Sequence, residues 1–156
     1  MSRAALVFFL ALGMATRAEG QRPSITVTGM RNLTFGTLIP GVPSAVPPTD
    51  RSRAARFDVR GDRTQALQLV FALPLHLDGP SGARLPVRYG PSAATYSLNA
   101  GMADAVAFDP AIPFTVSLPN SGRIQVNLGG TAMPTTTTPA GRYTAVITLT
   151  ASAPGN

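Results

Sequence analysis

The sequence contains no cysteine, no lysine and no tryptophan, and it has a single histidine. Without cysteine the chain can form neither a disulfide nor a thiolate metal site, and it has no cysteine nucleophile. One histidine and scattered aspartates do not provide the paired spacing that zinc or calcium ligands need. We therefore expect a protein without cofactor or metal.

Catalytic motifs are also scarce. His76 lies two residues before Asp78, and Ser81 and Ser92 follow, but no serine occupies a Gly-x-Ser-x-Gly elbow. The only glutamate, Glu19, lies near the amino terminus, so a carboxylate pair for glycoside cleavage would need aspartates that nothing in the sequence brings together. We expect that the protein is not an enzyme.

The amino terminus has the three parts of a secretory signal peptide. Arg3 precedes an apolar run over residues 4–15, and small residues follow up to Gly20. The apolar run is shorter than the roughly 20 residues that cross a bilayer. We expect residues 1–20 to be a signal peptide and residues 21–156 to be a single domain without a membrane span. The protein is then exported to the periplasm, the outer surface or the extracellular space.

Short runs of alternating apolar and polar residues, separated by glycine and proline, fill the rest of the chain. The clearest runs cover residues 56–60, 66–73, 114–118, 123–128 and 143–150. This period of two is typical of half-buried strands, and no helical period is present. The pattern predicts an all-β antiparallel β-sandwich with Greek-key connections, with an open barrel as the alternative. The expected core is Phe57, Val59, Leu67, Leu69, Phe71, Ile124, Val126, Tyr143, Ile147 and Leu149.

Four short motifs resemble a bacterial family. They are residues 33–38 (LTFGTL), Phe57-x-Val59-x-Gly61, residues 129–132 (GGTA) and residues 140–143 (AGRY). With them the chain resembles the bacterial domain of unknown function 4402 and, more distantly, spore coat protein U and the archaic chaperone-usher pilin subunits. The resemblance implies an immunoglobulin-like sandwich displayed outside the cytoplasm as a fibre or coat subunit, with no chemistry assigned. The chain departs from the pilin pattern because it lacks a cysteine pair.

Two strand edges are candidates for contacts with partners. The last alternating run places Tyr143, Ala145, Ile147 and Leu149 on one face of an edge strand. If the strand beside this edge is missing, Ile25 and Val27 form a small donor that can enter a neighbour's groove by β-strand addition. The partners are then other copies of the chain or related subunits, with an export chaperone. Alternatively, residues 25–29 are the first strand of the chain's own sheet, which the short preceding segment favours.

Arginine dominates the charge of the chain, whose formal net charge is +6. Five arginines lie in one stretch without interleaved aromatic residues: Arg51, Arg53, Arg56, Arg60 and Arg63. The stretch predicts a solvated strand face and no nucleic-acid site, whereas attraction to an acidic polysaccharide or lipid headgroup stays open. Within it, Arg60-Gly61-Asp62 matches a tripeptide that some adhesion receptors bind. We interpret this match as a turn, because Gly61 and Asp62 are both turn residues.

These observations leave two classes of function. The first is an exported, non-enzymatic structural or interaction protein of the bacterial envelope, resembling a pilin- or coat-type subunit. The second is a monomeric exported β-sandwich that binds a carbohydrate or other small ligand through its loops. Sugar-binding loops usually carry exposed aromatic residues, but this chain has no tryptophan and its three tyrosines lie in or beside expected strands. The sequence therefore favours the structural class.

Overall fold

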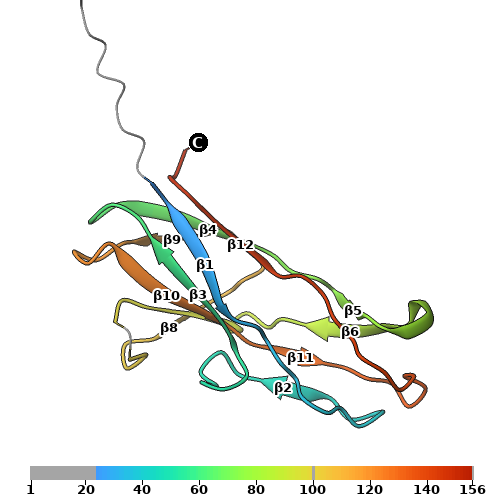
Figure 1. The fold of residues 1–156 in the computed structure, drawn as a ribbon. Helices are drawn as coiled ribbons and strands as arrows, with labels where there is room; N and C mark the ends of the chain where they lie inside the picture. Colours follow the sequence, from blue (N-terminus) through green and yellow to red (C-terminus); the bar gives the residue numbers. More distant parts are fainter. Residues whose placement is uncertain (1–23, 100, 156) are drawn as a thin grey trace, which may run out of the picture.

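The computed structural model describes residues 24–99 and 101–155 (Figure 1). The expected signal peptide lies outside these residues. The described residues form twelve strands and one turn of 3-10 helix, η1 (Pro80–Gly82). The strands are β1 (Thr26–Arg31), β2 (Ser44–Val46), β3 (Ala55–Arg60), β4 (Ala66–Ala72), β5 (His76–Asp78), β6 (Arg84–Arg88), β7 (Ala94–Ser97), β8 (Val106–Phe108), β9 (Phe114–Ser117), β10 (Arg123–Leu128), β11 (Gly130–Ala132) and β12 (Thr148–Ser152). Within this part of the chain, no helix is both long and apolar enough to span a bilayer.

Three antiparallel sheets build a β-sandwich, as the sequence predicts. The five-stranded sheet has the order β1-β3-β10-β7-β8, and the three-stranded sheet has the order β12-β4-β9. These two sheets form one half of the elongated molecule, and a four-stranded sheet, β2-β11-β6-β5, forms the other half (Figure 1). Strand β10 runs into β11 and β4 runs into β5, so the four-stranded sheet continues strands from both layers.

The core lies between the five-stranded and three-stranded sheets. Alternate residues of each strand point inward and are almost inaccessible to solvent, as the period of two requires. The buried cluster includes Phe57, Val59, Leu67, Leu69, Val116, Ile124, Val126, Leu128 and Leu149. Three of the expected core residues, Phe71, Tyr143 and Ile147, are only partly buried.

Aromatic rings fill the side of the sandwich where β8 and β9 form the sheet edges. The rings of Phe108 and Phe114 stack with their centroids 4.5 Å apart. Tyr96 lies against Phe114 at 5.4 Å. Such pairs stabilise a core beyond the area that they bury. The sandwich is therefore closed on this side by side chains from both sheets.

The last strand is shorter than the sequence predicts. Strand β12 begins at Thr148, and residues 143–147 form only an isolated bridge, between Thr144 and Asp78. The reason lies in the partner strand, because the pairing of β12 with β4 starts where Thr148 faces Ala72. Pro74 follows the end of β4, and proline cannot donate a hydrogen bond to a strand ladder. The predicted edge strand from Tyr143 is therefore wrong in its first half.

Candidate functional site: a lateral groove

A groove of about 1230 Å³ lies on the side of the sandwich opposite to the aromatic stack. One wall is formed by residues 29–40, from the end of β1 towards β2, and the other by residues 134–147, which precede β12. The two walls lie apart in the middle of their course and approach each other again at the far end (Figure 1), where a Cβ on Gly41 would lie 3.0 Å from the Thr136 side chain. We call this feature the lateral groove.

Strands β1 and β12 meet at one end of the lateral groove, where they contact each other without forming a ladder. Among the described strands, β1 pairs only with β3, and β12 pairs only with β4. The other edge of each strand therefore presents backbone N–H and C=O groups that no neighbouring strand of this part of the chain uses. Unpaired edges of this kind favour the addition of a further strand.

The floor of the lateral groove is apolar. Leu85 and Phe57 line it and also belong to the buried clusters of the two halves of the molecule, so the floor is the core itself. Along the first wall the partly buried side chains of Leu33, Phe35 and Leu38 pack against these clusters. The charged residues that line the groove are two arginines, Arg31 and Arg142, and no acid lines it. The groove therefore fits an extended segment with alternating apolar residues and no excess of positive charge.

The second wall is fixed by contacts to β5 and the residue after it. The backbone of Asp78 and Thr144 exchanges two hydrogen bonds, of 2.8 and 2.9 Å. The Tyr143 hydroxyl donates to the carbonyl oxygen of Pro139 at 2.7 Å. Its ring covers Gly79 so closely that a Cβ on Gly79 would lie 2.2 Å from it. The wall is therefore held in place although it forms no continuous ladder with β5.

Tyr89 lines the groove between the two halves of the core. Burial of its ring disfavours the charged phenolate and raises the pKa of Tyr89 from 10.0 to about 12. Its neutral phenol is therefore part of the apolar floor at every physiological pH.

We predict that Tyr89 reduces stability at alkaline pH. The unfolded chain loses its phenolic proton near pH 10 and the folded protein only near pH 12. The stability due to this difference is fully present below about pH 10 and is lost as the pH rises to about 12. Denaturant unfolding across this range measures the loss, and Tyr89→Phe should reduce it. An equal loss in Tyr89→Phe would assign the effect to other groups.

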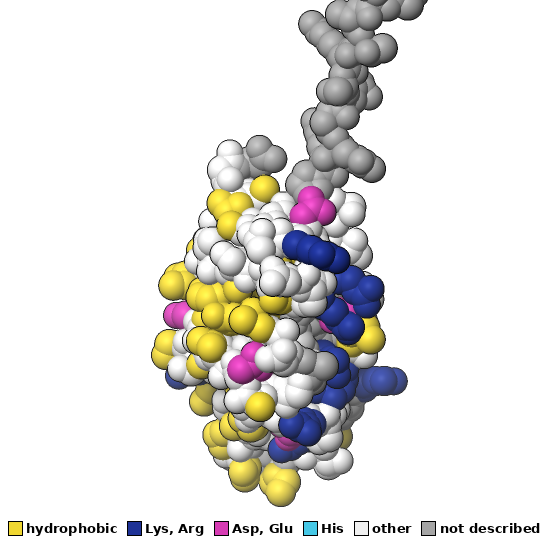
Figure 2. All heavy atoms as spheres, turned by 90° about the vertical axis from the view of Figure 1, so that its left-hand side faces the viewer, with side chains coloured by type: hydrophobic (Ala, Val, Ile, Leu, Met, Phe, Trp, Pro, Cys, Tyr) yellow, Lys and Arg dark blue, Asp and Glu magenta, His cyan; other side chains and the backbone are white. Residues whose placement is uncertain are grey.

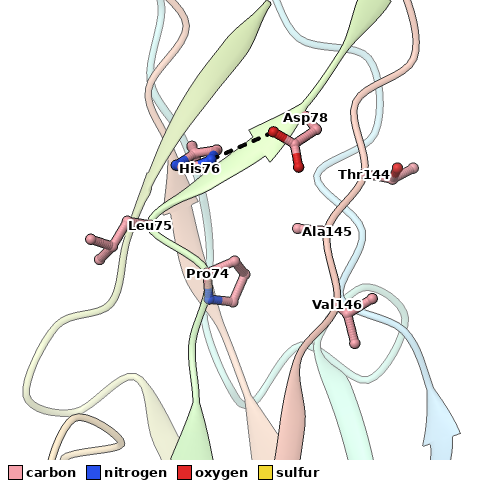
Figure 3. A pocket seen from close by; sticks show the side chains of 7 residues that line it. All are labelled: Pro74, Leu75, His76, Asp78, Thr144, Ala145 and Val146. Carbon is pink, nitrogen blue, oxygen red and sulfur yellow. Dashed lines mark ion pairs between the residues drawn. The ribbon is translucent and has the colours of Figure 1, made fainter. Parts of the chain in front are cut away.

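A second, shallow pocket of about 400 Å³ contains the only histidine (Figure 3). His76 Nε2 lies 3.5 Å from Asp78 Oδ1, and both side chains are well exposed. Ser81 and Ser92 do not line this pocket, so neither serine meets the pair there. Leu75 and Val146, both highly exposed, line the same pocket. Across the described residues, no three His, Cys, Asp or Glu side chains lie together as a metal site would require.

The structure places Ile25 and Val27 in the chain's own sandwich. Val27 faces Val59 in the register of β1 and β3, and the side chains of Ile25 and Val27 pack against the core. Of the two roles that the sequence leaves open for this segment, the structure agrees with the internal strand.

The Arg60-Gly61-Asp62 tripeptide forms the end of β3 and the turn that follows it. The Arg60 guanidinium lies 3.3 Å from Asp58 Oδ2 through both Nε and Nη2. Gly61 N–H donates to the carbonyl oxygen of Gly122. Gln65 Oε1 accepts a hydrogen bond from the Asp62 backbone. Each residue therefore has a structural partner, as expected for a turn.

Sequence reasoning missed the first wall of the lateral groove. The alternation of Leu33 and Phe35 within residues 33–38 is the signal that could have identified it. Comparisons of the chain with protein-family models, with curated proteins and with solved structures find no match.

Proposed function

We propose that this protein is an exported, non-enzymatic structural or interaction protein of the bacterial envelope that accepts a β-strand of a partner subunit in its lateral groove. The observation that carries the proposal is the apolar floor between two walls, residues 29–40 and 134–147, that form no strand ladder with each other across the groove. Main-chain hydrogen bonds to such walls provide affinity, and the pockets for alternate side chains provide specificity.

The dimensions of the groove define the occupant. Its second wall includes residues 138–147, so an extended strand that follows it has about ten residues and a length of roughly 33 Å at 3.3 Å per residue. Alternate side chains of this strand would face Phe57, Leu77 and Leu85 on the floor. The others would face solvent beside Arg31 and Arg142, where acidic or neutral residues are most favourable.

The occupant has to come from a segment other than residues 25–31. Those residues are already paired with β3 and packed on the core, so using them as a donor would expose Val59 and its neighbours. We therefore assign the donor to a partner subunit. The resemblance of the sequence to coat and pilin subunits supports this assignment.

A sugar-binding role for the loops has less support. None of the aromatic side chains in the described residues is among the exposed large apolar ones, and the most exposed of these are aliphatic. The described surface therefore offers no highly exposed aromatic face on which a sugar ring could stack.

A synthetic ten-residue peptide of alternating valine and threonine with glutamate at two outward positions tests the strand acceptor. We expect it to bind and to protect the backbone amides of residues 32–38 and 145–147 from hydrogen exchange. Replacing Leu38 by Glu should weaken binding by more than about tenfold, because it places a carboxylate in the apolar wall. Isothermal titration calorimetry measures the affinity.

Ile112→Glu is the matched control, since Ile112 is an exposed aliphatic residue of similar size that does not line the groove. This variant should bind the peptide as the unaltered protein does. Equal binding of a peptide with the same composition but without alternation, or an unchanged affinity in Leu38→Glu, would disprove the strand acceptor.

A further inference from the structure

The outer face of the five-stranded sheet is polar although much of it is buried. On β3, β10 and β7 the inward residues form the core, so the residues between them point outward. Five of these outward residues are at most 5% exposed: Asp58, Thr95, Ser97, Gln125 and Asn127. Polar residues usually lie on a sheet face because that face is exposed to solvent. Here the polar side chains are buried, so contact with solvent does not explain them.

Two arginines share one carboxylate on this face. Arg123 lies directly opposite Arg60 in the register of β10 and β3. Asp58, which is buried, accepts a 2.7 Å hydrogen bond from Arg123 Nε and contacts Arg60 at 3.3 Å. The two arginine side chains remain 44% and 61% exposed. One carboxylate balances one of the two charges, and the hydrogen bonds to Asp58 use only Nε of Arg123 and Nε and Nη2 of Arg60, so both guanidinium groups keep N–H donors for a ligand.

A second group of arginines lies at the other end of β3. Arg31 Nε donates to the carbonyl oxygen of Ala54 at 2.7 Å, and Arg51 donates to that of Gly101 at 3.0 Å. Arg56 faces Arg31 across β1 and β3. In the described residues, none of these three arginines forms an ion pair with a carboxylate. Backbone carbonyl oxygens hold Arg31 and Arg51 in place, and no carboxylate neutralises any of the three charges.

The space-filling view agrees with this distribution. Figure 2 shows arginine side chains gathered in a column along the right-hand edge of the molecule, with few acidic side chains among them. Apolar side chains gather elsewhere in the same view. A surface of one sign raises the local concentration of ions of the opposite sign.

The face also holds polar atoms that stability does not explain. Three buried side-chain atoms have no hydrogen-bond partner among the protein groups that the structure describes: Arg56 Nε, Thr95 Oγ1 and Gln125 Oε1. All three belong to neighbouring strands of the five-stranded sheet. Unpaired buried polar atoms destabilise a fold, and local violations of this kind concentrate at functional surfaces.

We propose that this surface, defined by Arg51, Arg56, Arg60 and Arg123 and here called the arginine face, binds an acidic polysaccharide. A chain of sugar carboxylates lying along β3 reaches both arginine groups, which are about 13 Å apart, four residues at roughly 3.3 Å each. Guanidinium groups bind carboxylates through paired N–H donors, and the exposed hydroxyl groups of Thr26 and Thr28 on β1 add partners for sugar hydroxyls. Arg31 borders both this face and the lateral groove, but the four arginines that define the face do not line the groove, so the proposal does not depend on it.

Two other polyanions fit the face less well. Proteins usually bind single-stranded nucleic acids by stacking the bases on aromatic side chains. The outward residues of β3, β7 and β10 include no aromatic residue. A lipid surface is usually bound by apolar side chains that enter it, and the same outward residues are polar or charged. A flexible chain of carboxylates needs only the arginines and hydroxyl groups.

Polygalacturonate is the probe for this proposal, with its fully methyl-esterified form as the uncharged control. We expect the full chain, without its expected signal peptide, to bind polygalacturonate in low salt, to release it as salt rises and to ignore the ester. Replacing Arg51 and Arg60 together by Gln should weaken binding roughly fivefold, because two surface charge contacts are lost. Biolayer interferometry measures both.

The double variant Arg84→Gln, Arg88→Gln removes the same charge from β6, in the four-stranded sheet, and should keep affinity within about twofold. Circular dichroism confirms that each variant is folded. The Arg51→Lys, Arg60→Lys variant keeps the charge and should retain most of the binding if the glutamine variant does not fold. Equal losses in the two glutamine variants, an affinity independent of salt, or tighter binding to duplex DNA or phosphatidylglycerol vesicles than to polygalacturonate would overturn the proposal.

Discussion

Replacing Gly129 by alanine is expected to lower the free energy of unfolding by about 3 kcal/mol or more. Gly129 joins β10 to β11, and a Cβ there would lie 2.1 Å from the carbonyl oxygen of Val46. The backbone of Pro47 and Pro48 lies 2.8 Å from the same position. Because these neighbours are backbone atoms, rotation of a side chain cannot relieve the overlap. Chemical denaturation monitored by circular dichroism measures the change.

Gly90→Ala is the control for this substitution. Gly90 has no atom within 4 Å of the position that a Cβ would take, and its φ does not lie in the left-handed region. Its replacement should therefore change stability by less than about 0.5 kcal/mol. A Gly129→Ala protein as stable as Gly90→Ala would show that β2 and β11 do not approach as the structure places them.

The close approach at Gly129 explains how one long strand serves two sheets. Gly129 N–H donates to the carbonyl oxygen of Ala93 at 2.8 Å, and Gly130 then pairs with Val46. The chain therefore changes partners at one residue, and the N–H of that residue is still paired. This continuity positions the floor of the lateral groove, because Leu85 on β6 is paired into the same four-stranded sheet.

The local pattern of the sequence predicts the strands that lie in the middle of the sandwich. Residues 66–73 and 123–128 were expected as strands, and β4 and β10 occupy residues 66–72 and 123–128. These strands have neighbours on both sides, so alternation in the sequence reflects the alternation of core and surface directly. The all-β antiparallel sandwich follows from the same pattern.

The lateral groove was not predictable in the same way. Its walls, residues 29–40 and 134–147, are far apart in the sequence, and the groove depends on where each loses its ladder partner. The second wall loses its ladder partner beyond the pair Thr148 and Ala72, where β4 ends shortly before Pro74. A pattern of period two shows that residues 143–147 are extended but does not show whether a neighbour is present.

The arginine face was predicted in part. The sequence places Arg51, Arg56 and Arg60 in one stretch, but Arg123 reaches them only through the register of β10 with β3. The burial of Asp58 between Arg60 and Arg123 is a consequence of that register. Long-range pairing is the step at which a single sequence gives least information, because a shift of one residue would turn these side chains inward.

The second large effect is expected at Ile124 on β10, and it is compared with Ile147, which precedes β12; the sequence places both isoleucines in the core. Ile124 is 1% exposed and contacts the central cluster, whereas Ile147 is only partly buried and lines the groove. Ile124→Ala should lower the free energy of unfolding by about 4 kcal/mol, because it removes buried methyl groups and leaves a cavity in the centre of the sandwich. Ile147→Ala should lower it by about 1–2 kcal/mol, because solvent or a bound strand can occupy the space.

Both isoleucine variants are measured by the same denaturant titration. Ile124→Ala, at a fully buried site, is the control for Ile147→Ala. If Ile147→Ala proves as destabilising as Ile124→Ala, residues 143–147 are a buried strand and the lateral groove is closed in solution. If its cost is small and rises when the alternating peptide is bound, then Ile147 is buried by the incoming strand and not by the chain itself. That second result would connect the shortened last strand directly to the strand-accepting function.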